Sequence, residues 1–270
     1  MKIRLSVFLA AALFAAGSSG ADFFVRGSVD ERLASAYMSR GRIGSTHLNW
    51  AQDVGLNLGF EGYGYLLLGL WSYSDVEPTY RAKRQMVFSE NDPAVGYGYN
   101  WKFADGWSLD SKAFYQWDLL FGNYSGTRYC HEWIWRETLN TPWISFFSLV
   151  RAMRMPYVDW SLRLGVFKSL PLGAGFSLTP RVFMDGGRAG WNERRFGGYD
   201  EEHDNFHDGP NSLTCEMQLN YQLSKSIRLY AAVCQFWSVT RAVRRNVDAN
   251  PADTSVPEVT YGHTGFTISF

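Results

Sequence analysis

The chain has 270 residues, a length that suits one large β domain or two domains of average size. Its 26 lysine and arginine residues balance 26 aspartate and glutamate residues, which argues against a nucleic-acid-binding protein with its usual basic surplus. Aromatic residues make up 17% of the chain, yet the mean hydropathy of -0.22 is too polar for a bundle of transmembrane helices.

The first 21 residues are predicted to be a cleavable signal peptide. Lys2 and Arg4 give it a positive start, residues 5–16 are apolar, and small residues end at Ala21. The apolar stretch falls short of the roughly 20 residues that span a bilayer as a helix. Residues 22–270 are then one exported domain without a helix-length apolar run, so this domain can span a membrane only as a closed β-barrel.

Alternation of apolar and polar residues predicts the strands. In residues 213–223, every second side chain from Leu213 to Leu223 is apolar, and Glu216 lies in the middle of the polar face. The chain contains twelve such segments, with ten as the alternative count because 34–43 alternates poorly. They lie near 34–43, 53–61, 63–73, 94–103, 107–117, 131–139, 143–153, 157–167, 173–184, 212–222, 227–238 and 260–270.

The strand faces and connections favour a transmembrane barrel over a soluble β-sandwich. Several polar faces carry charges in their middles, where a soluble core would be apolar, and strand lengths match a tilted crossing of a bilayer. Connections alternate between short turns and longer polar stretches. Short turns are predicted at 61–62, 104–106, 140–142, 169–171 and 224–225, and long ones at 74–93, 119–129, 186–211 and 240–258. The prediction is an all-β, up-and-down antiparallel transmembrane barrel with both termini at the short-turn end.

The C-terminal segment carries a family resemblance. Phe266, Ile268 and Phe270 alternate with small or polar residues, and the last residue is aromatic. This segment resembles the C-terminal strand of Gram-negative outer-membrane β-barrel proteins. The resemblance implies insertion by the barrel-assembly machinery and a location in the outer membrane, in contact with its lipid and lipopolysaccharide.

If the apolar faces meet lipid, the polar faces line the lumen, and we expect a narrow, porin-like channel for small polar solutes. Acids and bases are mixed along that face, which gives no strong preference for either ion sign. The candidate pore residues are Asn57, Asn100, Lys102, Asp110, Lys112, Glu132, Arg136, Asp159, Arg163, Arg181, Glu216 and Arg228, and Asp53, Glu61, Gln116, Gln218, Asn220 and His263 belong to the same face. No cofactor or metal is expected.

Two other functions stay open. A hydrolase acting on lipid or peptide would need a base at the extracellular rim, for which His131 and Asp185 are the candidates, although no known barrel-hydrolase motif is present. A binding or adhesion barrel would instead work through the long loops. Loop 199–208 holds five acids and two histidines at irregular spacing, which is weak grounds for a metal site.

Three cysteines are an odd number for an exported protein. Cys215 and Cys234 lie on the two arms of one predicted hairpin but on opposite faces, so a disulfide between them would distort the strands. With Cys130 they are predicted to be free thiols.

Overall fold

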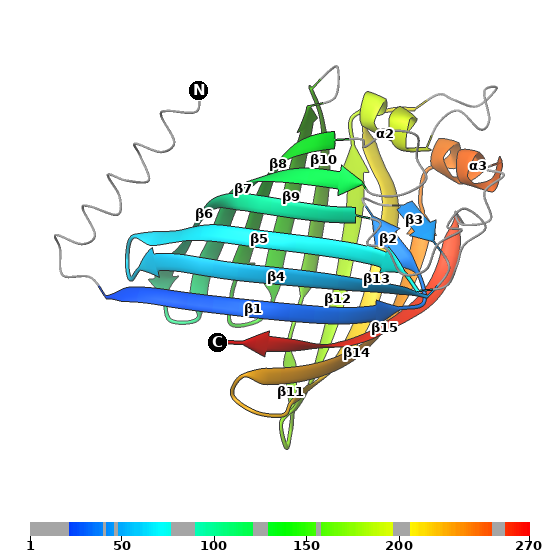
Figure 1. Cartoon of the computed structure of the whole chain (residues 1–270). Coiled ribbons are helices and arrows are strands. Elements are labelled where there is room, and N and C mark those ends of the chain that lie inside the picture. The colour runs from blue at the N-terminus through cyan, green and yellow to red at the C-terminus, as the bar shows by residue number, and fades with distance from the viewer. Residues whose placement is uncertain are drawn as a thin grey trace.

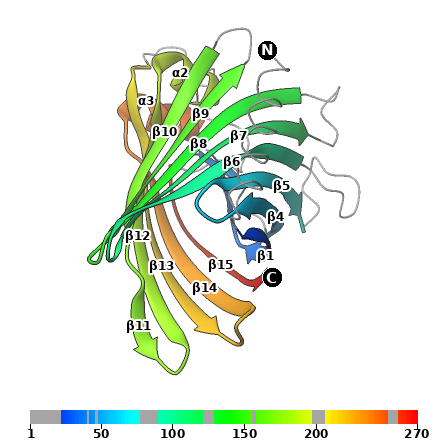
Figure 2. The same cartoon turned by 90° about the vertical axis from the view of Figure 1, so that its left-hand side faces the viewer.

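The computed structural model describes residues 22–39, 42–45, 48–76, 90–120, 129–154, 158–196, 206–249 and 257–270. One antiparallel sheet contains thirteen strands, and an additional pairing of β10 with β12 closes it into a barrel (Figure 1). The seam between β10 and β12 is visible in Figure 2. Twelve strands form the wall, because β11 lies outside the ring.

The wall strands are consecutive neighbours, as expected for an up-and-down barrel. They are β1 (Phe23–Ala34), β4 (Asn49–Phe60), β5 (Gly64–Asp75), β6 (Glu90–Ala104), β7 (Trp107–Leu120), β8 (Tyr129–Asn140), β9 (Ser145–Arg154), β10 (Val158–Phe167), β12 (Phe176–Gly187), β13 (Gly209–Gln222), β14 (Ile227–Ser238) and β15 (Glu258–Ser269). β2 (Tyr37–Ser39) and β3 (Arg42–Ser45) form a separate hairpin in the β1–β4 connection, and β11 is Leu170–Gly173.

The alternation predicted from the sequence sets the two faces of the wall. On β10, Trp160 and Leu164 are 41% and 49% exposed on the outside, whereas Asp159 and Ser161 are 6% and 9% exposed and face inward. Large apolar side chains cover the outer face of the other strands in the same way. They include Trp101, Phe103, Trp133, Trp135, Phe146, Val182, Met217 and Phe266. This surface suits contact with lipid.

The two ends of the barrel differ as predicted. Short connections join β4 to β5, β6 to β7, β8 to β9 and β13 to β14 at one end. At the other end lie α2 (Ala189–Phe196) and α3 (Arg241–Ala249), each inside a long connection (Figure 1). The sequence had not predicted these helices. Within the described residues, no helix has both the length and the hydropathy needed to cross a membrane.

Both termini of the barrel lie at the short-turn end. The C-terminal Phe270 exchanges two backbone hydrogen bonds with Gly27 on β1, with N···O distances of 2.7 and 3.0 Å. The ring of Phe270 also covers Gly27 so closely that a Cβ atom there would overlap it. The first and last strands are therefore fastened together where the barrel closes.

The predicted first strand was wrong, although the count of twelve is confirmed. The strand is Phe23–Ala34 rather than 34–43, and it begins directly after the predicted cleavage site. Its outward face reads less clearly because Glu31 interrupts it. That carboxylate accepts hydrogen bonds from Trp50 Nε1 at 2.7 Å and from Gln52, so neighbouring polar groups satisfy it on the outer face.

The predicted turn at 169–171 was also wrong, because Leu170 and Pro171 belong to β11. The chain reverses instead at Gly173, Ala174 and Gly175, which all have positive φ values of 87°, 50° and 81°. Two glycines make this left-handed backbone accessible. Pro171, which lacks a backbone N–H, is accommodated because β11 is an edge strand.

Candidate functional site: a cavity in the barrel lumen

A cavity of about 440 Å³ lies inside the barrel. Arg32 on β1 and Leu149 on β9 both line it, and these strands are six positions apart in either direction around the ring. The cavity therefore reaches from one side of the lumen to the other. Its lining consists of Arg32, Ala34, Ala36, Asn49, Arg136, Thr138, Phe147, Leu149, Arg163, Phe167, Arg181, Phe183, Glu216, Tyr261 and His263.

The inner faces of β8, β9, β10 and β12 carry one arginine each, and we call this surface the basic wall. Strand register explains the clustering, because Arg136 and Arg163 are both cross-strand partners of Leu149. Arg181 lies two residues before Phe183 on β12, and both side chains line the same cavity. Arg151 completes the series on β9 and contacts Glu132 on β8.

Three of the four arginines in the basic wall each form an ion pair with a carboxylate. Arg163 makes a two-pronged contact with Asp185, at 2.8 Å from Nε and 3.1 Å from Nη2. Arg151 contacts Glu132 at 2.8 Å, and the Arg181–Glu216 ion pair is longer, at 3.3 Å. Within a barrel wall such pairing offsets much of the cost of removing charge from water.

The arginine is the more exposed member of every pair. The side chains of Arg151, Arg163 and Arg181 are 25%, 22% and 36% exposed, whereas their carboxylate partners are 0%, 9% and 9% exposed. The negative charges are thus held against the wall, and the guanidinium groups lie between them and the open lumen. The basic wall presents positive charge to the cavity even though most of its charges are paired.

Arg32 and Arg136 have no salt bridge to any described residue. Arg136 is exposed because its side chain projects into the open lumen. It interacts electrostatically with Asp53 and Asp110 on one side and with Arg151 and Arg163 on the other. Asp53, on β4, is itself exposed to the lumen and is the acid that opposes Arg136.

Phenyl rings separate the arginines of the cavity. Gly165 pairs with Phe147 on one side and Phe183 on the other, and the ring of Phe147 and the Cβ atom of Phe183 fill the space that the glycine leaves. The guanidinium carbon of Arg163 lies 4.4 Å from the centre of the Phe183 ring. That of Arg181 lies 5.6 Å from the Phe167 ring and 5.9 Å from the Phe147 ring. These cation–π contacts fix the arginines in place.

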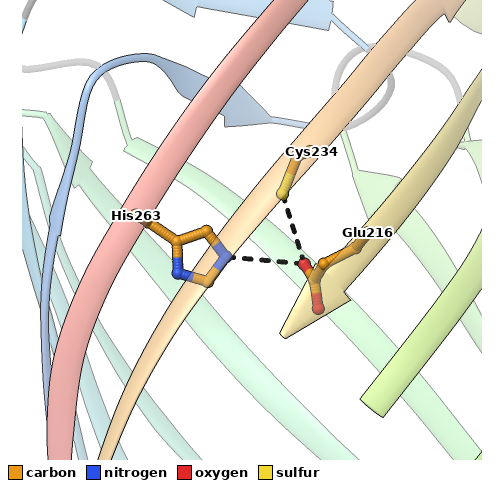
Figure 3. Close-up of side chains that lie close together, drawn as sticks. All are labelled: Glu216, Cys234 and His263. Atoms are coloured by element: carbon orange, nitrogen blue, oxygen red, sulfur yellow. Dashed lines mark hydrogen bonds and ion pairs between the residues drawn. The ribbon is translucent and has the colours of Figure 1, made fainter. Parts of the chain in front are cut away.

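A side-chain cluster of Glu216, Cys234 and His263 occupies the edge of the cavity (Figure 3). It forms because β13, β14 and β15 are neighbours and these positions all face inward. The Cys234 thiol donates to Glu216 Oε2 at 3.6 Å, and His263 Nε2 lies 3.5 Å from the same oxygen. The carboxylate lies between the thiol and the imidazole, so the order differs from a Cys–His nucleophile pair.

The same three side chains could hold a metal ion, since their ligand atoms lie within 4.8 Å of one another. Sulfur, nitrogen and carboxylate oxygen would suit Zn²⁺. However, Glu216 already pairs with Arg181, and the arginines of the cavity oppose a cation there. A second cluster, Glu90, Asp92 and Asp118, offers oxygen ligands, and Gln116 Nε2 donates to its Asp92 and Asp118, both at 2.9 Å.

The structure places all twelve candidate pore residues on the inner face. It brings four of them together in the cavity, namely Arg136, Arg163, Arg181 and Glu216, while the others lie at other levels of the lumen. Sequence reasoning missed Arg32, because it lies in the strand that was misplaced. It also missed Phe147, Phe167 and Phe183, because apolar residues were assigned to the lipid face.

The rim pair proposed for a hydrolase is not brought together. His131 lies on the outer face of β8 and stacks on Tyr115, with ring centres 5.8 Å apart. Asp185 faces inward on β12 and is engaged by Arg163. The two side chains do not meet, because His131 faces outward on β8 whereas Asp185 faces inward on β12.

The remaining predictions have mixed outcomes. Cys215 and Cys234 are free thiols on opposite faces, as predicted, whereas the side chain of Cys130 lies outside the described residues. Residues 199–205 of the acidic loop and the signal peptide, residues 1–21, also lie outside them. At the end of that loop, Asp208 Oδ1 accepts a hydrogen bond from the first backbone N–H of α2 at 2.7 Å, so one acid of the loop serves a helix terminus.

Comparison with known proteins gives the fold. No protein-family model and no curated protein matches the chain. Among solved structures, an outer-membrane channel from Pseudomonas putida F1 is similar, with a TM-score of 0.50, 11% identity, and 91% of this chain and 95% of that chain covered. The NanC porin has a TM-score of 0.49 and 12% identity over 89% of this chain and 98% of that chain. The KdgM porin has a TM-score of 0.47 and 13% identity over 90% and 99%. The likeness to the Pseudomonas putida channel agrees with the transmembrane barrel architecture described above.

Proposed function

We propose that the protein is an exported outer-membrane β-barrel of a Gram-negative bacterium that forms a narrow, porin-like channel for small polar solutes. The observation that carries the proposal is the cavity of about 440 Å³ lined from opposite sides of the barrel. A barrel of twelve strands is wider than the eight-stranded barrels that side chains fill, and narrower than sixteen-stranded porins with an aqueous channel.

The polarity of the lumen supports this proposal. Charged side chains such as Asp53 and Arg136 are exposed although they project into the barrel interior. Exposed charge inside a barrel indicates a hydrated lumen, since charges in a dry interior would be fully enclosed by partners. The twelve inward-facing candidates would line the path of the solute on either side of the cavity.

The proposal includes the route and surroundings of the protein. Residues 1–21 would be removed on export, and the C-terminal strand ending in Phe270 would be read by the barrel-assembly machinery. The apolar outer face would contact outer-membrane lipid and lipopolysaccharide. No nucleic-acid partner is proposed, because the numbers of basic and acidic residues are equal.

Reconstitution into planar lipid bilayers tests the channel. We expect discrete conductance steps from the wild-type protein, and bilayers that stay sealed at all voltages would overturn the proposal. Thr138→Trp, which adds bulk to the cavity lining, should reduce the conductance of each step. Leu172→Trp is the matched control, because Leu172 is 59% exposed on β11, outside the barrel wall. Equal steps from both variants would show that current does not pass through this lumen.

A further inference from the structure

We infer that the cavity is a binding site for small organic carboxylates with an apolar ring, and that it makes the channel prefer anions. This inference rests on the proposed channel function and names the solute class that the same lumen would select. The balanced charge of the whole chain gives no hint of it, since the preference comes from where the charges are placed.

The first step is the charge that the cavity presents. Four arginines line it, and Glu216 is the one acid among its lining residues. Asp185, which is more buried than Arg163, forms an ion pair with it, and Asp53 interacts electrostatically with Arg136. Because the guanidinium groups are more exposed than the carboxylates that pair with them, a solute in the cavity meets positive charge first.

The second step is hydrogen bonding. Arg32 Nε and Arg181 Nε are buried and have no hydrogen-bond partner among the described residues. A buried donor without a partner costs free energy that a bound acceptor recovers. The guanidinium group is a planar set of donors that matches the two oxygens of a carboxylate. Arg32 and Arg136 lack salt bridges to described residues, so their charge is available to a solute.

The third step is the apolar part of the cavity. Phe147, Phe167 and Phe183 line it together with the arginines. Phenyl rings do not stabilise the binding of an inorganic ion, whereas a solute that carries a ring buries apolar surface against them. Because the rings lie beside Arg163 and Arg181, a carboxylate and an attached ring could contact both kinds of side chain at once. The volume of about 440 Å³ falls within the range of small-molecule pockets.

The experiment uses full-length protein in planar bilayers. A KCl gradient should give a reversal potential that shows chloride to be more permeant than potassium. Benzoate should block the KCl current at a concentration about tenfold lower than benzamide, its uncharged counterpart, because hydrogen bonds to charged groups are stronger. Acetate, which has the charge without the ring, should also block less well than benzoate.

The double variant Arg32→Gln/Arg136→Gln removes two charges that form no salt bridge with a described residue. We expect its chloride-to-potassium permeability ratio to fall about threefold and the preference of block for benzoate over benzamide to disappear. Arg26→Gln is the matched control. Arg26 also lies on β1 but is 66% exposed at the short-turn end, paired with Glu61, and outside the cavity. It should leave both measurements unchanged.

Each outcome separates this inference from the proposed function. A conducting wild type that prefers potassium, or that benzoate and benzamide block equally, overturns the inference and leaves the channel standing. If acetate and benzoate block the current equally well, the inference that the bound solute carries an apolar ring is overturned. If the wild type does not conduct, benzoate binding to the detergent-solubilised protein is measured by calorimetry. Binding that is lost in the double variant and kept in Arg26→Gln would then support the site without the channel, and absent binding overturns both.

Discussion

Two sets of strands in the barrel wall use charge differently on their inner faces. On the basic wall, buried carboxylates of Glu132 and Asp185 lie behind more exposed arginines. The inner faces of β1, β4 and β7, which we call the acidic wall, carry Asp30, Asp53 and Asp110, alongside Arg32 on β1 and Lys112 on β7. Asp30 accepts hydrogen bonds from Tyr230 and Thr267, at 2.8 and 2.6 Å. Neutral hydroxyl groups thus hold an acid of the acidic wall, whereas carboxylates position cations in the basic wall. An ion pair therefore leaves one charge exposed to the lumen when its two members are buried unequally.

The strongest test of this comparison removes one carboxylate from each wall. Asp185→Ala should lower the free energy of unfolding by about 3 kcal/mol, because Asp185 is only 9% exposed and accepts two hydrogen bonds from Arg163 that no other group replaces. Asp110→Ala should cost less than about 1 kcal/mol, because Asp110 and its partner Lys112 are both about a quarter exposed.

Denaturant unfolding of the protein in lipid vesicles, followed by tryptophan fluorescence, measures both losses. Similar decreases in the free energy of unfolding of the two variants would mean that the paired carboxylates of the two walls are equally accessible to water. The proposed difference between the basic wall and the acidic wall would then be wrong.

The second test concerns packing behind the arginines. A Cβ atom at Gly165 would lie 2.5 Å from the ring of Phe147 and 2.6 Å from the Cβ atom of Phe183, so Gly165→Ala must displace two residues that line the basic wall. We expect a loss of about 1–3 kcal/mol. Gly55→Ala on the acidic wall is the matched control, because its nearest neighbour, Ser28 Oγ, would lie at 3.4 Å. The same unfolding measurement applies, and an equal effect at both glycines would show that the rings move freely.

The faces of the strands could be predicted from the sequence, because each strand alternates independently of the others. Cavity composition could not be predicted in this way. Arg136 and Arg163 become neighbours only because the register of three strands aligns both with Leu149. The room for the inward-facing ring of Phe147 depends likewise on its cross-strand partner Gly165, which has no side chain. Register is a tertiary property that a single strand does not encode.

The errors in the fold have related causes. Residues 23–34 were missed because Glu31 breaks the apolar face, and its partners Trp50 and Gln52 belong to the next strand of the wall. α2 was missed because the acceptor for its first backbone N–H is Asp208, nineteen residues away. In both places the satisfying group comes from a distant part of the chain, which local patterns do not reveal.

The third test removes the charge of one acid on the acidic wall and measures ion preference. Asp53 is exposed to the lumen and opposes Arg136, so Asp53→Asn should raise the chloride-to-potassium permeability ratio about twofold. Asp105→Asn, in the exposed β6–β7 turn, removes an equal charge outside the lumen and should leave the ratio unchanged. Reversal potentials in KCl gradients give both values.

Salt concentration separates an electrostatic cause from a structural one. The gain from Asp53→Asn should shrink in 1 M KCl, where the screening length is about 3 Å, compared with 0.1 M KCl, where it is about 10 Å. A gain that persists unchanged at high salt would mean that the substitution alters the shape of the lumen. The opposition of the two walls would then not be what sets ion preference, and the arginines of the basic wall would act only through direct contact with the solute.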